Sequence, residues 1–202
     1  AAMIELINQE RNAHIGTIED PIEFVFKDKK SLIDQREVGV DTKSFPEALK
    51  RVLRQDPNVI YVGEMRDPET ISAALTAAET GHLVFSTLHT PNAAEAVERI
   101  VGVFDGFKQK QVLVQLAAVL RAVVAQILLP GIKGGRVAAR EILVNTPAVA
   151  NLIRENKVAQ IDSVIQTGAK DGMVTLANAI QELIKNGLVD KEAAKQRIEE
   201  KT

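Results

Sequence analysis

The sequence contains no cysteine, and aromatic residues make up only 3% of its 202 residues. Without thiols, disulfide frameworks and thiolate zinc sites are excluded, and a reducing compartment is the expected environment. Because aromatic residues are so few, the core must be aliphatic. With 46% hydrophobic residues, the chain has enough apolar surface to form such a core. An aliphatic core is typical of a buried parallel sheet covered by helices rich in alanine and leucine.

A basic excess is also lacking, because the formal net charge is −2 and the isoelectric point is about 6.0. Proteins that bind nucleic acid over much of their surface usually carry such an excess. We therefore predict no nucleic-acid partner, and a nucleic-acid motor on a similar core is only an alternative.

Long apolar runs are missing as well. The most apolar stretch, residues 112–129, is interrupted by Gln115, Arg121 and Gln126, so it falls short of the roughly 18 residues that a membrane-spanning helix needs. No basic start followed by an apolar block marks a signal peptide. We predict a cytoplasmic protein without a transmembrane segment.

Apolar runs and helical stripes alternate along the first two thirds of the chain. Strands are predicted at 15–18, 59–62 and 82–88, and helices at 1–8, 46–55, 68–80, 91–101 and 108–128. A β-hairpin or meander is predicted across 23–40, and a strand or strand pair at 136–144 after a glycine-rich loop at 131–135. Asp41 or Ser44 is expected to cap the helix that begins near Pro46.

From Thr146 onward every predicted element is helical. These helices cover 147–155, 158–167, 175–186 and 191–201, with Asp190 as the cap of the last. Strands that alternate with helices, followed by helices alone, imply an α/β layer and a helical subdomain. We predict a core domain at 1–145 and a C-terminal all-helical subdomain at 146–202.

Acidic and imidazole side chains follow the predicted strands. Glu19 and Asp20 follow the first, Glu64 follows the second and His89 follows the third, whereas His82 opens that third strand. Ligands of open α/β sheets bind outside the carboxyl ends of the strands. These groups are therefore predicted to converge on one crevice.

Glu64 carries the strongest signal of these residues. It follows an apolar strand and a glycine, where a carboxylate is costly unless it meets a cation or an activated water. In nucleoside triphosphatases such a residue holds magnesium or orients the attacking water. The alternatives are a helix cap or an ion pair with Arg66.

The other candidates have structural alternatives of equal or greater weight. The acids of residues 19–23 are also typical of a capped turn, and His82 and His89 stand about 20 Å apart on one extended run, too far to share a metal. Arg54 and Arg66 are candidates to reach a neighbouring subunit's nucleotide. Salt bridges to nearby acids would explain both arginines as well.

Three segments resemble signature boxes of the secretion ATPases that power type II secretion and type IV pili. Residues 17–24 (TIEDPIEF) are similar to the aspartate box, residues 56–67 (DPNVIYVGEMRD) to the Walker B segment, and residues 80–90 (TGHLVFSTLHT) to the histidine box. The resemblance covers nearly the whole chain. It implies a RecA-like P-loop NTPase core with a mostly parallel sheet, followed by a small all-helical subdomain.

Within this superfamily the chain is most similar to the motors that retract type IV pili. Residues 35–39 (QREVG) and 165–168 (IQTG) resemble that branch, and residues 148–155 (AVANLIRE) are similar to its signature AIRNLIRE, with Val149 and Ala150 as the departures. The retained signature residues are Asn151, Leu152, Ile153, Arg154 and Glu155. An extension or type II secretion ATPase is the alternative, although those motors commonly carry a four-cysteine zinc subdomain.

The phosphate-binding loop of the family, ending in Gly-Lys-Ser/Thr, precedes the helix predicted here at 1–8, and none of these residues matches it. That loop supplies a cradle of backbone N–H groups and a lysine. We expect the natural protein to be an ATPase and these 202 residues alone, which also lack the family's N-terminal domain, to bind nucleotide poorly. A non-catalytic interaction module of the same family is the alternative.

The resemblance also implies roles, cofactors and partners. ATP and Mg²⁺ are the implied cofactors, and the implied partners are five further copies in a homo-hexamer and the inner-membrane platform protein of the pilus base, where the motor is cytoplasmic and peripheral. Glu64 would hold Mg²⁺ or the water, and Glu19 or Glu23 would polarise that water. His82 would sense the γ-phosphate. The remaining candidates are nucleotide-binding or act in trans: Asp20, His89, Arg54 and Arg66.

Overall fold

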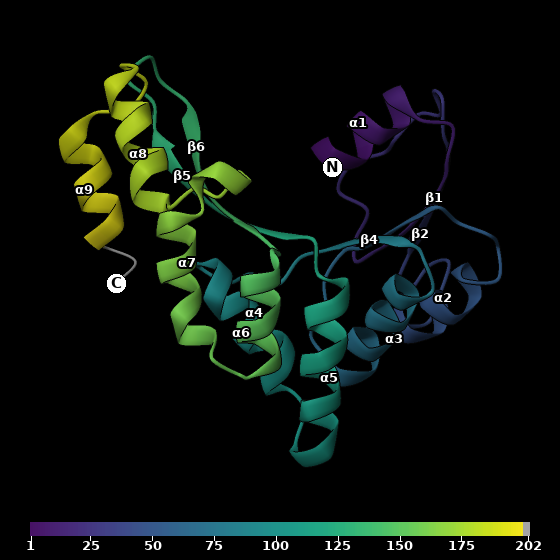
Figure 1. Ribbon diagram of the computed structural model, residues 1–202. Coiled ribbons are helices and arrows are strands. Elements are labelled where there is room, and N and C mark those ends of the chain that lie inside the picture. The colour runs from purple at the N-terminus through teal and green to yellow at the C-terminus, as the bar shows by residue number, and fades with distance from the viewer. Residues whose placement is uncertain (200–202) are drawn as a thin grey trace. The chain divides into compact units, whose positions relative to one another are not determined.

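The computed structural model describes residues 1–199, which form two compact units. The first comprises Ala1–Leu88 and Val103–Asp105, and the second comprises His89–Gly102 and the chain from Gly106 onward. Parallel strands and helices make up the first unit, as Figure 1 shows, so the predicted α/β class is confirmed.

The first unit is built on a sheet of four parallel strands. These are β1 (His14–Glu19), β2 (Leu32–Glu37), β3 (Val59–Val62) and β4 (Leu83–Ser86), in the order β2-β1-β3-β4. The strands predicted near 15–18, 59–62 and 82–88 are confirmed as β1, β3 and β4.

The predicted hairpin or meander across 23–40 is wrong. Only Leu32–Glu37 forms a strand there, and it pairs in parallel with β1. Alternation of polar and apolar residues reveals a pleated strand but not the direction of its partner. The intervening residues 20–31 are long enough for the crossover that parallel strands require.

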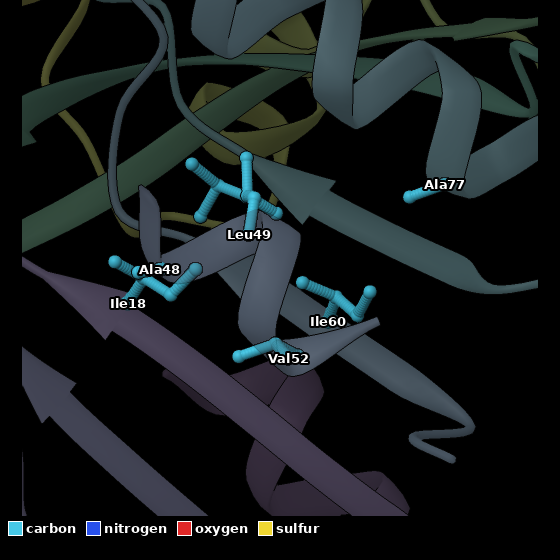
Figure 2. Close-up of a cluster of buried hydrophobic side chains, with 7 residues drawn as sticks. Ile18, Ala48, Leu49, Val52, Ile60 and Ala77 are labelled. Atoms are coloured by element: carbon cyan, nitrogen blue, oxygen red, sulfur yellow. The ribbon is translucent and has the colours of Figure 1, made fainter. Parts of the chain in front are cut away.

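Helices cover both faces of this sheet. Helices α2 (Phe45–Val52) and α3 (Pro68–Glu79) pack on one face, and α1 (Ala2–Glu10) packs on the other. Because strand residues alternate between faces, Ile18 and Ile60 meet α2, as Figure 2 shows, whereas Ile15 and Val59 lie in the cluster with α1. The seven buried residues of the first cluster are Ile18, Ala48, Leu49, Val52, Ile60, Val62 and Ala77.

Helix α2 begins where its sequence predicts. Ser44 is the N-cap, with its hydroxyl accepting a hydrogen bond from the Glu47 N–H at 3.4 Å, and proline occupies the first turn. Asp41, the other predicted cap, instead accepts a hydrogen bond from the Glu37 N–H at 2.9 Å.

The second unit combines a β-hairpin with helices. Strands β5 (Ala122–Pro130) and β6 (Arg136–Val144) pair antiparallel, and helices α8 (Leu176–Lys185) and α9 (Lys191–Glu199) pack on them through a common apolar cluster. The other helical elements are α4 (Ala93–Gly102), α5 (Gly106–Val119), α6 (Pro147–Arg154), η1 (Val158–Gln160), α7 (Ile161–Thr167) and η2 (Ala169–Asp171).

Every element described after Thr146 is helical, as predicted, and Asp190 caps α9 by accepting hydrogen bonds from the N–H groups of Glu192 and Ala193. The predicted last helix extended to residue 201, and its residues 200 and 201 lie outside the described part of the chain. The compact units reflect spatial contacts, so the functional domain boundary between 145 and 146 stays a prediction.

The helix predicted at 108–128 is wrong in its second half. Helix α5 ends at Val119, and β5 begins at Ala122. Alternate residues Ala125, Ile127 and Leu129 are buried, which is the period of a strand. The apolar positions fit the period of a helix as well as that of a strand. Pairing with β6 decides in favour of a strand, the conformation that β-branched residues prefer.

No helix within residues 1–199 combines the length and the apolar character needed to cross a membrane.

Leu49 lies at the centre of the first apolar cluster and is 0% exposed. We predict that Leu49→Ala lowers the free energy of unfolding by about 2–5 kcal/mol, because it leaves a cavity as well as losing apolar burial. Leu32→Ala is the matched control, since Leu32 is 56% exposed, and should change that free energy by no more than about 0.5 kcal/mol. Urea unfolding of both variants measures the difference, and equal losses would contradict this packing.

Asp67 caps helix α3, accepting hydrogen bonds from the Thr70 N–H at 2.8 Å and the Thr70 hydroxyl at 2.6 Å. Burial raises the pKa of Asp67, but the hydrogen bonds from Thr70 outweigh it and hold that pKa below 3.8. The stabilisation is therefore fully present above pH 3.8 and is lost as the pH falls through the lowered folded-state value.

We predict that Asp67→Ala lowers the unfolding free energy at pH 7 by about 0.5–2 kcal/mol through loss of the cap. Asp67→Asn keeps an acceptor oxygen without a titrating group, so its stability should fall less steeply with acid below about pH 4. Urea unfolding across that range measures both effects, and identical acid slopes in the native protein and Asp67→Asn would refute the charged cap.

Candidate functional site

The carboxyl ends of the parallel strands bring together the residues that follow them. Glu19 ends β1, and the chain after β3 continues through Gly63 to Glu64. Past the ends of the regular strands, the Gly63 N–H donates to the Ile18 carbonyl at 2.7 Å, and the Thr87 hydroxyl donates to the Gly63 carbonyl at 2.5 Å. Glu19 and Glu64 therefore leave the sheet at the same edge.

Gly63 makes this approach possible. A Cβ atom at this position would lie 3.2 Å from the Ile18 carbonyl oxygen and 3.3 Å from the Cα of Glu19, both of them backbone atoms that cannot rotate away. A side chain here would require the backbone of β1 to move by a few tenths of an ångström, so glycine suits this close approach of β3 to β1.

Glu19 is 5% exposed, and its side chain is held by hydrogen bonds. Its Oε1 accepts hydrogen bonds from the Thr17 hydroxyl at 2.6 Å and from Gln35 Nε2 at 3.0 Å. Thr17 lies opposite Gln35 on one side and opposite Tyr61 on the other, so these residues form one row across the sheet. Hydrogen bonds to an ionised acceptor are the stronger kind, and they fix the orientation of this carboxylate.

The loop after β1 carries two exposed acids, Asp20 and Glu23. Side chains of β2 hold its backbone: Glu37 Oε2 accepts from the Ile22 N–H at 3.0 Å, and Gln35 bonds both the Phe24 carbonyl and the Phe26 N–H. The rings of Phe24 and Phe26 meet edge to face at 5.0 Å. The loop is therefore an ordered part of the sheet edge.

The far end of this loop is tied to helix α1. Buried Asn8 donates to the Lys27 carbonyl at 2.8 Å and accepts from the Lys29 N–H at 3.1 Å. Lys29 also pairs with Glu5, and hydrogen bonds from Lys29, Gln9 and Asn8 lower the pKa of Glu5 to about 2. Both ends of the acidic loop are thus anchored.

The pKa of Tyr61 depends on the acids of this region. Burial raises the pKa of Tyr61, and the negative charges of Glu19 and Glu23 raise that pKa further. Both carboxylates therefore act on the face of the sheet that carries Tyr61.

Glu64 is partly buried, with 16% of its side chain exposed, and its Oε2 lies 2.7 Å from Nε of Arg66, which is 69% exposed. The ion pair that was the alternative interpretation of Glu64 is present. Because Arg66 is largely in solvent, the pair contributes no more than about 1 kcal/mol.

The donor set at this edge suits Mg²⁺ bound together with phosphate. Among residues 1–199 no three His, Asp or Glu side chains lie close enough to form a metal cage. Mg²⁺ is usually held by one or two carboxylates, substrate phosphates and water rather than by a cage. Glu64, a single partly buried carboxylate, fits that mode.

Within the first unit, His82 lies away from these acids. His82 precedes β4, and its Nδ1 lies 2.9 Å from the Ala77 carbonyl oxygen and 3.2 Å from the Thr80 hydroxyl. It therefore stands at the amino ends of the strands, a strand length of about 13 Å from the acidic edge. The histidine-box segment spans a whole strand, so its two histidines leave at opposite ends.

Arg54 also lies at the amino edge. It is exposed in the turn between α2 and β3, just before Asn58, whose N–H donates to the His14 carbonyl at the start of β1 at 2.8 Å. Of the two candidate arginines, only Arg66 shares the edge of Glu64.

The remaining candidates belong to the second unit. His89 is exposed and has a positive φ of 53°. In helix α6 the signature residue Ile153 is buried and Leu152 half-buried, whereas Asn151, Arg154 and Glu155 are exposed. Hydrogen bonds from Lys157 and Asn151 lower the pKa of Glu155, whose Oε2 lies 2.7 Å from Lys157 Nζ. The signature thus combines an apolar anchor with a polar surface.

Four residues of the site were not among the predicted ones: Thr17, Gln35, Tyr61 and Thr87. A period of two from Glu19 back to Thr17 and from Gly63 back to Tyr61 would have placed two of them on the face of Glu19. Gln35 had no such signal, because its position follows from the parallel register that was predicted as a hairpin.

Comparison with known proteins gives consistent matches. Residues 1–133 match the family model described as "Type II/IV secretion system protein". The chain is 58% identical over 198 residues to the twitching motility protein of Neisseria gonorrhoeae, covering 98% of this chain and 53% of that protein. It is 53% identical over 197 residues to the type IV pilus retraction ATPase PilT of Pseudomonas aeruginosa, covering 98% of this chain and 57% of that protein.

Among solved structures, the pilus retraction motor PilT with bound ADP superposes with a TM-score of 0.88 at 52% identity, covering 96% of this chain and 55% of the other. The chain spans about half the length of the curated relatives that it matches.

We predict that Gly63→Ala lowers the unfolding free energy by about 1–3 kcal/mol, because the added methyl group meets immobile backbone of β1. Gly102→Ala is the matched control: Gly102 ends helix α4, and a Cβ there would meet no atom within 4 Å. That control should leave stability unchanged or slightly raised. Urea unfolding compares the two, and native stability of Gly63→Ala would show that the close approach is not required.

Proposed function

The chain belongs to the type II/IV secretion system protein family, and on that premise we propose that it is the nucleotide-hydrolysing part of a motor that retracts type IV pili. The names of its relatives, a twitching motility protein and a pilus retraction ATPase, support the retraction branch. Because the chain spans about half of those relatives, the proposed activity refers to the full gene product.

The observation that carries this proposal is the common edge of Glu19 and Glu64, held by the hydrogen bond of 2.7 Å between Gly63 and Ile18. Phosphoryl transfer needs little covalent chemistry from the protein and depends on positioned charges. A sheet edge with one partly buried carboxylate and an anchored acidic loop supplies such charges outside the ends of parallel strands.

We assign to Glu64 the role of contacting Mg²⁺ or the attacking water. When bound with ATP, Mg²⁺ would neutralise charge that develops on the phosphate oxygens. Glu64 would hold it through a carboxylate oxygen, in exchange for part of its contact with Arg66. Asp20, which is exposed directly after β1, lies at the same edge and is the second candidate for contact with nucleotide.

The two glutamates of the aspartate box differ in their surroundings, and this difference suggests their roles. Glu19 is buried, and two hydrogen bonds engage its Oε1. Glu23 is exposed on a loop whose backbone is fixed. A general base must come within hydrogen-bonding reach of water, so we assign that role to Glu23 and a supporting role to Glu19.

A homo-hexameric ring would complete the site. Arg54 is exposed at the edge opposite Glu64, whereas Arg66 is already paired with Glu64. In a head-to-tail ring, opposite surfaces of neighbouring subunits meet. Arg54 is therefore the better candidate to reach a neighbour's nucleotide and stabilise the transition state.

The proposed location is the cytoplasmic side of the inner membrane at the pilus base, with the platform protein as partner. The exposed polar side of the signature helix, Asn151, Arg154 and Glu155, is the candidate surface for passing on force. The γ-phosphate contact of His82 and the nucleotide contact of His89 stay predictions, and the contacts seen for His82 are those of a residue that follows helix α3.

We predict that Glu64→Gln in the full gene product lowers kcat for ATP by about 100-fold or more, within the range for loss of a catalytic acid or base, with nucleotide affinity changed only slightly. The amide keeps the size of the side chain and removes the charge. Steady-state phosphate release and ADP titration measure the two quantities.

Glu69→Gln is the matched control, because it makes the same change at an exposed carboxylate. Glu69 lies on helix α3 and pairs with Lys50 at 2.8 Å. The kcat of this variant should equal that of the native protein. Near-native turnover by Glu64→Gln would refute the role of Glu64.

A further inference from the structure

Building on the proposed function, we propose that Gln35 is a positioning residue of the hydrolytic site: its side-chain amide joins the Glu19 carboxylate to the backbone of the loop that carries Glu23. The two acids thereby keep one fixed arrangement relative to each other.

The contacts of Gln35 use both ends of its amide. Nε2 donates to Glu19 Oε1 at 3.0 Å and to the Phe24 carbonyl at 2.9 Å, and Oε1 accepts from the Phe26 N–H at 2.8 Å. Three of the four hydrogen bonds open to such an amide are therefore made. The flipped orientation would turn the amide oxygen toward a carboxylate and a carbonyl, so these partners define the orientation.

The side chains of Gln35 and Glu37 form the hydrogen bonds with the loop backbone that a paired strand would otherwise form. Glu37 accepts from the Ile22 N–H at 3.0 Å, and Gln35 takes the next two bonds at Phe24 and Phe26. Among residues 1–199 every hydrogen bond of the loop backbone from 22 to 26 goes to one of these two side chains. The backbone on both sides of Glu23 thus depends on β2.

The chemistry of the position favours an amide. A carboxylate at position 35 would repel Glu19 and could not donate to either oxygen. An apolar side chain would leave the Phe24 carbonyl and the Phe26 N–H without their partners, which costs free energy when such groups are shielded from water. Gln35 also stands in register with Thr17, the second donor to Glu19, so both donors reach the carboxylate from one row of the sheet.

The first test is the kinetics of Gln35→Met in the full gene product. Methionine has similar length but forms none of the three hydrogen bonds, so kcat for ATP should fall about 10- to 100-fold, the scale of a displacement of about 1 Å at a reacting centre. KM should stay within about twofold, because the change affects the acids rather than nucleotide binding. Gln35→Glu should lose at least as much kcat.

Asp34→Asn is the matched control on the same strand. The Asp34 side chain pairs with His14 at 2.9 Å on the opposite face of the sheet, so this variant should keep native kcat. If Gln35→Met folds poorly by circular dichroism, Gln35→Asn supplies the same test with a polar side chain one methylene shorter and the same expected split of kcat and KM.

The second test is spectroscopic and does not require activity. Tyr61 is the sole tyrosine and the sequence has no tryptophan, so tyrosinate absorbance reports its ionisation directly in the 202-residue chain. Glu23→Gln removes one of the charges that raise the pKa of Tyr61. Gln35→Met should shift the titration of Tyr61 to lower pH in the same direction as Glu23→Gln, and Asp34→Asn should not.

The outcomes separate this inference from the function on which it rests. Absence of ATP turnover by the native full-length protein would overturn the proposed function and the role of Gln35 with it. Native turnover with unchanged kcat in folded Gln35→Met, or an unchanged Tyr61 titration in that variant, would overturn the role of Gln35 alone.

Discussion

The hydrogen bond from the Gly63 N–H to the Ile18 carbonyl, at 2.7 Å, is the contact on which the site depends. It extends the pairing of β1 and β3 beyond their regular ends, and glycine at position 63 avoids a tight contact between a Cβ and the backbone of Glu19. A parallel sheet alone would bring several strand ends to one edge. This contact brings the segment that carries Glu64 directly beside the end of β1, and so allows acids far apart in the sequence to share one ligand.

The three glutamates near this contact have different surroundings. Glu19 is buried and hydrogen-bonded, Glu64 is paired with an exposed arginine, and Glu23 is exposed on a loop tied down at both ends. Burial without partners would make an ionised carboxylate costly. Hydrogen bonds offset that cost for Glu19 and Arg66 offsets it for Glu64, whereas Glu23 is exposed to solvent. The result is a set of negative charges of graded accessibility, which suits the binding of a cation and the handling of water within a small region.

Much of this arrangement could be predicted from the sequence, because the strong signals are local. The sequence identified the apolar run before Gly63, the cap Asp190 and the helices after Thr146, and Ser44 was one of two candidate caps for helix α2. The two errors have one cause. The pattern of residues 23–40 fits two kinds of partner strand and that of residues 120–128 fits both a helix and a strand, and only the pairing with another strand decides. The parallel register of β1 and β2 places Gln35 beside Glu19, so that relation could not be inferred from spacing alone.

We propose that the acids after β1 and β3 surround one bound triphosphate. A crystal structure of the full gene product with a non-hydrolysable ATP analogue and Mg²⁺ tests this arrangement. We expect the γ-phosphate outside the carboxyl ends of β1 and β3, with Glu64 on the metal side and Glu23 facing the position of the attacking water. Density for the triphosphate at another surface, with Glu19 and Glu64 away from it, would contradict this arrangement.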